Sequence, residues 1–361
     1  MIVEKLKWQH PLHSICATLV KRICSFSFEF YRRTTSFGFR AMNDPHDDRV
    51  FGLLYVSEKR TSHANLKAHH DPVDTYLSCA VTCSAFYRAQ AKRLVVLTNA
   101  RERLLDRCKR LNIENRVDLQ PHKFCLQVPH GIPFYEAHFK LDLLDAFGSG
   151  EYGPCVTLVD LDTVALRPIR AASGLGLVNL GAEALGAAPE DILRRDISRL
   201  SKVGVSEVFW FGGEFLSGSA DLFCLLSANI KKIWPQYLGD LKTFHHIGDE
   251  MLINAAVPKL LAEGVKIDDF AGSGDVTRWW SSRTVAPQVP FCQIAGSAVL
   301  HLPGDKPFLA AWRTVKSPQP EAFLREYKKY VQTRIALRRM ASTFDKILSR
   351  KRRNWFVPSL V

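Results

Sequence analysis

Short apolar runs alternate with amphipathic stretches along the first half of this 361-residue chain. The runs have the length of buried β-strands, and the stretches between them repeat apolar residues at helical spacing. Such alternation predicts an α/β fold with a mostly parallel central sheet flanked by helices. The predicted strands are 50–56, 93–98, 117–119 and 156–159, and the predicted helices are 75–88, 101–111 and 138–147.

The pattern becomes less regular in the second half of the chain. Glycine, alanine, serine and tryptophan are frequent there, and turn formers interrupt the apolar runs. In chain order we predict an irregular segment at 171–188, a strand at 208–216 interrupted by two glycines, a helix from Ser219 or Asp221, a helix from near Asp249, a loop at 272–283 and a strand at 298–301.

Composition indicates a globular protein of a reducing compartment. Apolar residues make up 47% of the chain, which allows a substantial core. The nine cysteines include no CxxC pair, and Cys79 and Cys83 are four residues apart in a predicted helix, where buried thiols are commoner than metal ligands. This usage is typical of the cytoplasm rather than of a disulfide framework. We therefore expect a cytoplasmic protein.

The net charge of +13 is concentrated at the two ends of the chain. Residues 1–41 carry +5 and residues 311–361 carry +10, which leaves −2 for the residues between them. The central part is therefore not expected to bind nucleic acid. We predict a basic N-terminal arm at 1–46, a central domain at 47–310 and a basic amphipathic tail at 311–361.

The tail repeats apolar and aromatic residues at helical spacing between Phe323 and Leu348, with basic residues among them and a basic run at 350–353. This pattern is typical of a helix that lies on an anionic membrane surface. A helix that packs on the central domain with a solvated basic face is the alternative. No apolar run near the start reaches the roughly 20 residues that span a bilayer. Any membrane contact is therefore expected to be peripheral, on the inner face.

Two carboxylates, Asp160 and Asp162, follow the predicted strand at 156–159. Ligands of open α/β sheets gather at the carboxyl ends of strands, and carboxylates there suit Mg²⁺ or Mn²⁺. A solvated turn is one alternative. Another is a phosphatase of the haloacid-dehalogenase type with Asp160 as nucleophile, because Val-Asp-Leu-Asp-Thr-Val resembles its motif. That motif usually opens its domain, whereas here a long α/β segment precedes it.

A second motif begins with His301 at the end of the last predicted strand. A lone histidine at such a place is more often a core residue than a ligand. Here Gly304 and Lys306 follow it, within Leu-Pro-Gly-Asp-Lys-Pro. Imidazole is an acceptable ligand of Mn²⁺, the glycine lets the backbone approach a phosphate, and the lysine offers that phosphate a positive charge. Together the three residues predict a site for a metal and a diphosphate.

The two motifs together resemble retaining glycosyltransferases of family 8, the glycogenin and lipopolysaccharide galactosyltransferase type, which have the GT-A fold. In that family a DxD motif follows a buried strand, and a late motif combines His, Gly and Lys-Pro-Trp. The resemblance covers roughly residues 48–310, with phenylalanine in place of the tryptophan. It implies that Mn²⁺ or Mg²⁺ and the diphosphate of a nucleotide-sugar donor bind here. The implied metal ligands are Asp160, Asp162 and His301, and the implied diphosphate contacts are Gly304 and Lys306.

The resemblance also implies roles around the donor sugar. Lys140 should face the donor from its helix, and the segment around Gly213 should line the sugar site. Asp249 and Glu250 fall where the family carries Asp-Gln-Asp, with Met251 in place of the second aspartate. A carboxylate there stabilises an oxocarbenium-like transition state or attacks the anomeric carbon, by analogy with retaining glycosidases. A surface lysine, a β-bulge and an acidic helix start are the ordinary alternatives.

The resemblance implies transfer from a UDP-sugar, with retention, to a glycan or glycolipid such as lipopolysaccharide. The first strand departs from the family, because Tyr55 is followed by Lys59 and Arg60 instead of the segment that holds the uridine. The nucleotide base therefore stays open. Besides the phosphatase, a catalytically silent binding protein of the same fold remains an alternative.

Overall fold

The computed structural model describes residues 48–354, apart from 59–65, 67–70, 182–183, 185–187 and 282–287. The predicted arm at 1–46 lies outside the described residues. None of the helices in the described part of the chain has the length and hydropathy needed to cross a membrane.

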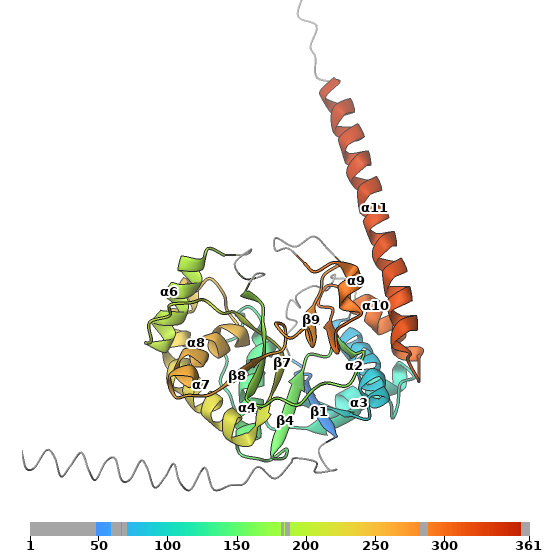
Figure 1. The fold of residues 1–361 in the computed structure, drawn as a ribbon. Helices are drawn as coiled ribbons and strands as arrows, with labels where there is room; N and C mark the ends of the chain where they lie inside the picture. The colour runs from blue at the N-terminus through green and yellow to red at the C-terminus, as the bar shows by residue number, and fades with distance from the viewer. Residues whose placement is uncertain are drawn as a thin grey trace, which may run out of the picture. The chain divides into compact units, whose positions relative to one another are not determined.

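A seven-stranded sheet runs through the described domain in the order β3-β2-β1-β4-β7-β6-β8 (Figure 1). The first four of these strands are parallel, β7 is antiparallel to both of its neighbours, and β6 and β8 are parallel. The predicted α/β fold with a mostly parallel sheet is therefore confirmed. The bounds are β1 Arg49–Leu53, β2 Arg93–Thr98, β3 Asp118–Pro121, β4 Cys155–Val159, β6 Leu175–Asn179, β7 Phe211–Ser219 and β8 Ile267–Asp269.

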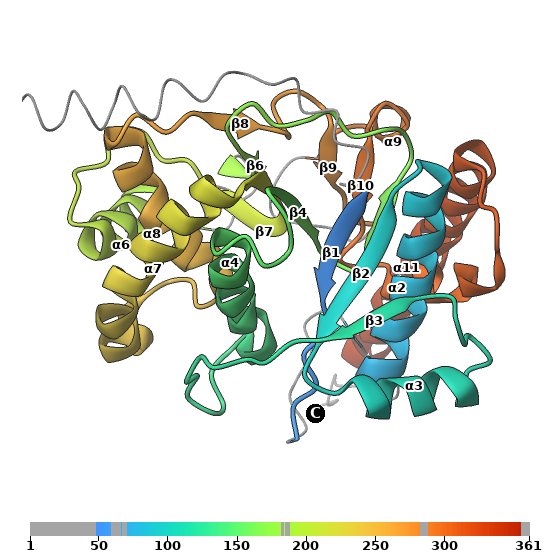
Figure 2. The same cartoon turned by 90° about the horizontal axis from the view of Figure 1, so that it is seen from below.

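Helices lie on both sides of this sheet, with α2 and α3 on one side and α4 and α7 on the other (Figure 2). Asp71 caps α2 by accepting a hydrogen bond from the backbone of Asp74, and Ser219 caps α7 where its start was predicted. The bounds are α2 Pro72–Ala89, α3 Arg101–Arg110, η1 Tyr135–Phe139, α4 Lys140–Gly148, α6 Glu190–Ser201, α7 Ala220–Asp240, η2 Leu241–Thr243, α8 Asp249–Ala262, α9 Phe291–Ile294, α10 Lys306–Ala311, η3 Trp312–Thr314 and α11 Pro320–Asn354.

The second half of the chain is more regular than its sequence suggests. The segment predicted to be irregular contains β6, and the predicted loop at 272–283 contains β9, Val276–Arg278. A glycine in β6 has a packing reason, since a Cβ at Gly176 would lie 2.6 Å from the ring of Phe270. β7 continues as one strand through the glycines at 212 and 213, but its pairing with β6 shifts register between Gly212 and Ser217.

A small second sheet brings the two predicted motifs together. It has the order β5-β10-β9, where β5 is Thr163–Ala165 and β10 is Val299–His301. β5 begins directly after the acidic pair and is antiparallel to β10, so that His301 lies opposite Thr163. β9 is parallel to β10 on its other side and places Arg278 beside His301. The pairing explains how residues about 140 positions apart in the sequence form one site.

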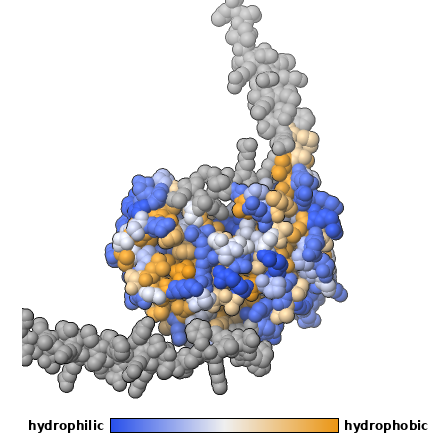
Figure 3. Space-filling view, viewed as in Figure 1, coloured by the Kyte–Doolittle hydropathy of each residue, from blue (hydrophilic) through white to orange (hydrophobic). Residues whose placement is uncertain are grey.

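The start of the long helix α11 belongs to the packed domain. A second apolar cluster, separate from the main core, is built around β10 and α2, and Phe323, Tyr327 and Val331 of α11 are buried in it. Packing on the domain, the alternative interpretation of the tail, therefore holds for this part of the helix. Beyond it α11 leaves the domain (Figures 1 and 3), and Leu337 and Met340 are 55% and 52% exposed.

Candidate active site

Strand order places a crevice between β1 and β4. From β1 the chain builds β2 and β3 to one side and then returns to add β4 on the other, and such a reversal is where open α/β sheets bind ligands. A cavity of about 430 Å³ lies there. Tyr55, just after β1, and Asp160, just after β4, both line it. The topology thus locates the site independently of any motif.

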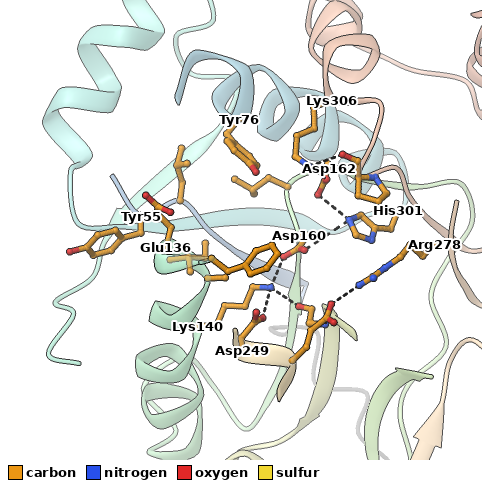
Figure 4. A pocket seen from close by; sticks show the side chains of 18 of the residues that line it. Tyr55, Tyr76, Glu136, Lys140, Asp160, Asp162, Asp249, Arg278, His301 and Lys306 are labelled. Carbon is orange, nitrogen blue, oxygen red and sulfur yellow. Dashed lines mark hydrogen bonds and ion pairs between the residues drawn. The ribbon is translucent and has the colours of Figure 1, made fainter. Parts of the chain in front are cut away.

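Three potential metal ligands converge in this cavity (Figure 4). Nε2 of His301 lies 3.3 Å from Oδ1 of Asp162 and 4.0 Å from Oδ2 of Asp160. One ligand atom from each residue lies within 4.8 Å of the others. Two carboxylates and an imidazole form a donor set that suits Mn²⁺, and the oxygens suit Mg²⁺ as well. The three residues therefore fit a divalent cation.

Two buried lysines flank the acidic pair. Nζ of Lys140 lies 2.9 Å from both Asp160 and Asp249, and it donates a hydrogen bond to the carbonyl of Gly213 at 2.8 Å. Nζ of Lys306 lies 2.7 Å from Asp162. Both lysine side chains are no more than 10% exposed. The cavity wall therefore carries two lysines, each paired to a carboxylate of the acidic pair.

The charges of the site are strongly coupled. Burial opposes the charged form of Asp162, but Lys306 and His301 outweigh it and lower the pKa of that carboxyl well below its usual value. Burial also opposes a charged His301, yet Asp162 and Glu214 raise the pKa of the imidazole to about 9. The pKa of Asp160 is raised, chiefly by burial. The charge of each of these three side chains therefore depends on the charges of its neighbours.

The sequence prediction missed a buried salt bridge behind the histidine. Arg278 donates two hydrogen bonds to Glu214, at 2.9 and 2.7 Å, and one to Glu250 at 2.8 Å. Glu214 is fully buried, and its Oε1 lies 3.6 Å from Nδ1 of His301. A carboxylate behind an imidazole fixes the orientation of the ring. Glu214 is therefore placed to orient His301, and no local pattern could have paired it with Arg278.

The glycines of β7 let these side chains lie against the strand. A Cβ at Gly213 would be 2.2 Å from Oδ2 of Asp249, and a Cβ at Gly212 would be 1.9 Å from Oε2 of Glu214. Any larger residue would displace the carboxylates. The two glycines thus make room for the ionic cluster.

Glu250 is held by hydrogen bonds on the same wall. Nε1 of Trp210 donates to it at 3.0 Å and Arg278 at 2.8 Å, while Nε2 of His246 lies 3.8 Å away. Burial opposes its charge, but Arg278 and His246 lower the pKa of Glu250 below its usual value. Glu250 is thus an ionised, fixed carboxylate.

All but one of the predicted site residues line this single cavity. The exception is Gly304, which lies in the loop between two lining residues, Pro303 and Lys306. Tyr76 and Glu136 line the cavity without having been predicted, and Figure 4 shows them with the site. The lining residues that were predicted are Lys140, Asp160, Asp162, Gly213, Asp249, Glu250, His301 and Lys306.

No protein-family model matches this sequence, and no curated protein matches it. Among solved structures, the chain is similar to the galactosyltransferase LgtC in complex with donor and acceptor sugar analogs. The TM-score is 0.42 and the sequence identity is 13%, and the match covers 74% of this chain and 99% of that chain. It is also similar to an active-site mutant of LgtC, with a TM-score of 0.39 and 15% identity, covering 70% of this chain and 86% of that chain. The function is inferred from the side chains of the site.

Proposed function

We propose that the chain is a metal-dependent glycosyltransferase of the GT-A type. It transfers a sugar from a nucleoside-diphosphate donor, a UDP-sugar, with retention, to a glycan or glycolipid acceptor such as lipopolysaccharide. One observation carries the proposal: Asp160, Asp162 and His301 converge beside Lys306 in a cavity between β1 and β4, where the strand order of the sheet reverses. A cation site next to a buried lysine is what binding and release of a diphosphate require.

Several residues of the site would together stabilise the departing diphosphate. Asp160, Asp162 and His301 would hold Mn²⁺ or Mg²⁺, which when bound neutralises charge on the departing nucleoside diphosphate. Lys306 adds a fixed positive charge on the same side, and Gly304 before it lets the backbone approach the phosphates. Glu214 keeps the imidazole of His301 oriented from behind.

The opposite wall suits the donor sugar. Asp249 and Glu250 face the cavity as carboxylates, each fixed by a cation, Lys140 or Arg278. Since Glu250 already accepts hydrogen bonds from Trp210 and Arg278, we assign it electrostatic stabilisation of the oxocarbenium-like transition state rather than nucleophilic attack. The bond from the anomeric carbon to phosphate oxygen breaks, the bond to the acceptor oxygen forms, and the departing phosphate takes the acceptor's proton.

The exposed residues in the distal part of α11 favour an acceptor that lies at a membrane surface. Ile335, Leu337 and Met340 are exposed there, and the sequence beyond them is strongly basic. Apolar and basic residues on one helix suit an anionic membrane, at about 1 kcal/mol per cation near the surface. The protein should sediment with anionic vesicles at low salt and not with neutral ones. Equal sedimentation with both would contradict this.

A panel of nucleotide sugars with Mn²⁺ tests the proposed function. The expected result is release of nucleoside diphosphate from at least one donor, lost on removal of Mn²⁺ and in Asp162→Ala. A phosphatase would instead release phosphate from simple monoesters and would tolerate His301→Ala. A silent binding protein would bind a donor without turnover. Either of these last two results would replace the proposal.

A further inference from the structure

Asp305 is a fully buried carboxylate inside the second motif, between Gly304 and Lys306. It accepts a hydrogen bond from Oγ of Ser281 at 2.5 Å and one from Oη of Tyr327 at 2.6 Å, and it forms an ion pair with Arg334. Among these three side-chain partners, Tyr327 and Arg334 come from α11. Burying a carboxylate without such partners is costly, so the contacts fix where this part of the loop lies.

The same helix holds the rest of the loop. Nη1 of Arg334 also donates to the carbonyl of Gly304, at 3.4 Å. The ring of Phe308, one turn after Asp305, lies 5.1 Å from the ring of Tyr327 and 4.8 Å from that of Tyr330. The position that departs from the family's tryptophan is therefore an anchor for α11.

The hydrogen bond from Tyr327 and the ion pair with Arg334 do not depend on pH near neutrality. Burial and the neighbouring Asp305 raise the pKa of Tyr327 far above its usual range, so its hydroxyl stays a donor. Arg334 is always charged, and its side chain is 28% exposed. None of the described residues of α11 lines the cavity, and the helix contacts both this loop and the segment beside Trp280, where Nη1 of Arg334 donates to Oγ of Ser281 at 2.7 Å.

We propose that Arg334 and Tyr327 are positioning residues that act through Asp305 to hold the loop carrying Gly304 and Lys306 in its donor-binding position. The donor role of this loop rests on the proposed function, whereas the mechanical link does not. Lys306 follows Asp305 directly and reaches Asp162 at 2.7 Å, so a shift of Asp305 moves a cation of the cavity wall. The long C-terminal helix is in this way part of the donor site.

Hydrogen exchange of the loop tests the link without any ligand. Arg334→Met should speed amide exchange across residues 302–309 at least tenfold, and Arg334→Lys should bring it back to within threefold of wild type. Arg325→Met is the matched control, because Arg325 lies on the same helix with a 64% exposed side chain paired only to Glu326 among its described ion pairs. Exchange within twofold of wild type in Arg334→Met would overturn the proposal.

Nucleotide affinity tests the consequence for the site. Arg334→Met should weaken Mn²⁺-dependent binding of UDP at least tenfold, with recovery in Arg334→Lys and no change in Arg325→Met. Unchanged affinity beside faster exchange would also overturn the positioning role. If wild type binds no nucleoside diphosphate, the proposed function fails, and the exchange data still decide the link. Should Arg334→Met not fold, Tyr327→Phe removes a single hydroxyl and is expected to act in the same direction.

Discussion

The salt bridge behind the metal ligands gives the sharpest prediction on stability. Replacing Arg278 by methionine keeps most of the side-chain volume but removes three charge-assisted hydrogen bonds. It leaves Glu214, which is fully buried, and Glu250, which is 16% exposed, without their guanidinium partner, while the imidazoles of His301 and His246 stay within 3.6 and 3.8 Å of them. The variant thus measures the cost of removing the main cation from two buried carboxylates.

The expected loss can be estimated from the burial of the pair. Removing one partner of a buried ion pair costs about 3–5 kcal/mol of unfolding free energy. Arg278 is only 13% exposed and holds two carboxylates, so solvent screening should reduce this little. Arg278 outweighs burial and keeps the pKa of Glu214 below its usual value. The contribution is therefore present above the ordinary glutamate pKa of about 4.3 and is lost as the pH falls below it.

Urea unfolding of Arg278→Met near neutral pH measures this loss. The double variant with Glu214→Gln should lose less than the sum of the single variants, by about 1–3 kcal/mol, because the two residues interact directly. Arg325→Met should stay within about 0.5 kcal/mol of wild type, as an exposed substitution. A loss below about 1 kcal/mol in Arg278→Met, or additive single variants, would refute the reasoning.

Three further predictions follow from packing and charge. Gly213→Ala should weaken donor binding at least tenfold in a titration, because the added Cβ would displace Asp249. Gly218→Ala should leave donor binding unchanged, because a Cβ there makes only ordinary van der Waals contacts; equal affinities of the two variants would contradict this. Phe323→Ala should cost about 3–5 kcal/mol in urea unfolding, since the ring is fully buried, and a negligible loss would show that α11 is not anchored there. Although burial opposes its charge, hydrogen bonds from neighbouring backbone and side chains lower the pKa of Asp268 to about 2. Asp268→Asn should therefore destabilise the folded protein at pH 7, and this loss should shrink as the pH falls from about 4 to 2. A loss of unfolding free energy that does not change with pH would be inconsistent with this.

The sequence could predict what is encoded locally. Asp160, Asp162 and His301 each end or follow an apolar strand, and residues at strand ends of an α/β sheet tend to meet. That rule, with the resemblance, is enough to name most of the Asp, Glu, Lys and Arg residues that line the cavity. The sequence also predicts the alternation of strands and helices before β4, because most of these elements are long enough to show the spacing of apolar residues that is typical of a strand or a helix.

What the sequence could not predict depends on pairing between distant segments. Arg278 lies in a three-residue strand, and only the register of β9 on β10 sets it beside His301. Asp305 resembles a solvent-exposed turn residue until α11, some 20 to 30 positions later, covers it. In the sequence the glycines of β7 look like interruptions of a strand, because the room that they leave for carboxylates depends on residues from distant segments.

Binding of Mn²⁺ alone tests the central claim most directly. Calorimetric titration of the wild-type chain should give one site, and Asp162→Ala and His301→Ala should each weaken it at least tenfold while remaining folded. Asp145→Ala is the control, because that aspartate is 55% exposed and pairs with a surface lysine outside the cavity. Affinity unchanged in both ligand variants, or no binding by the wild-type chain, would contradict the assignment of the site.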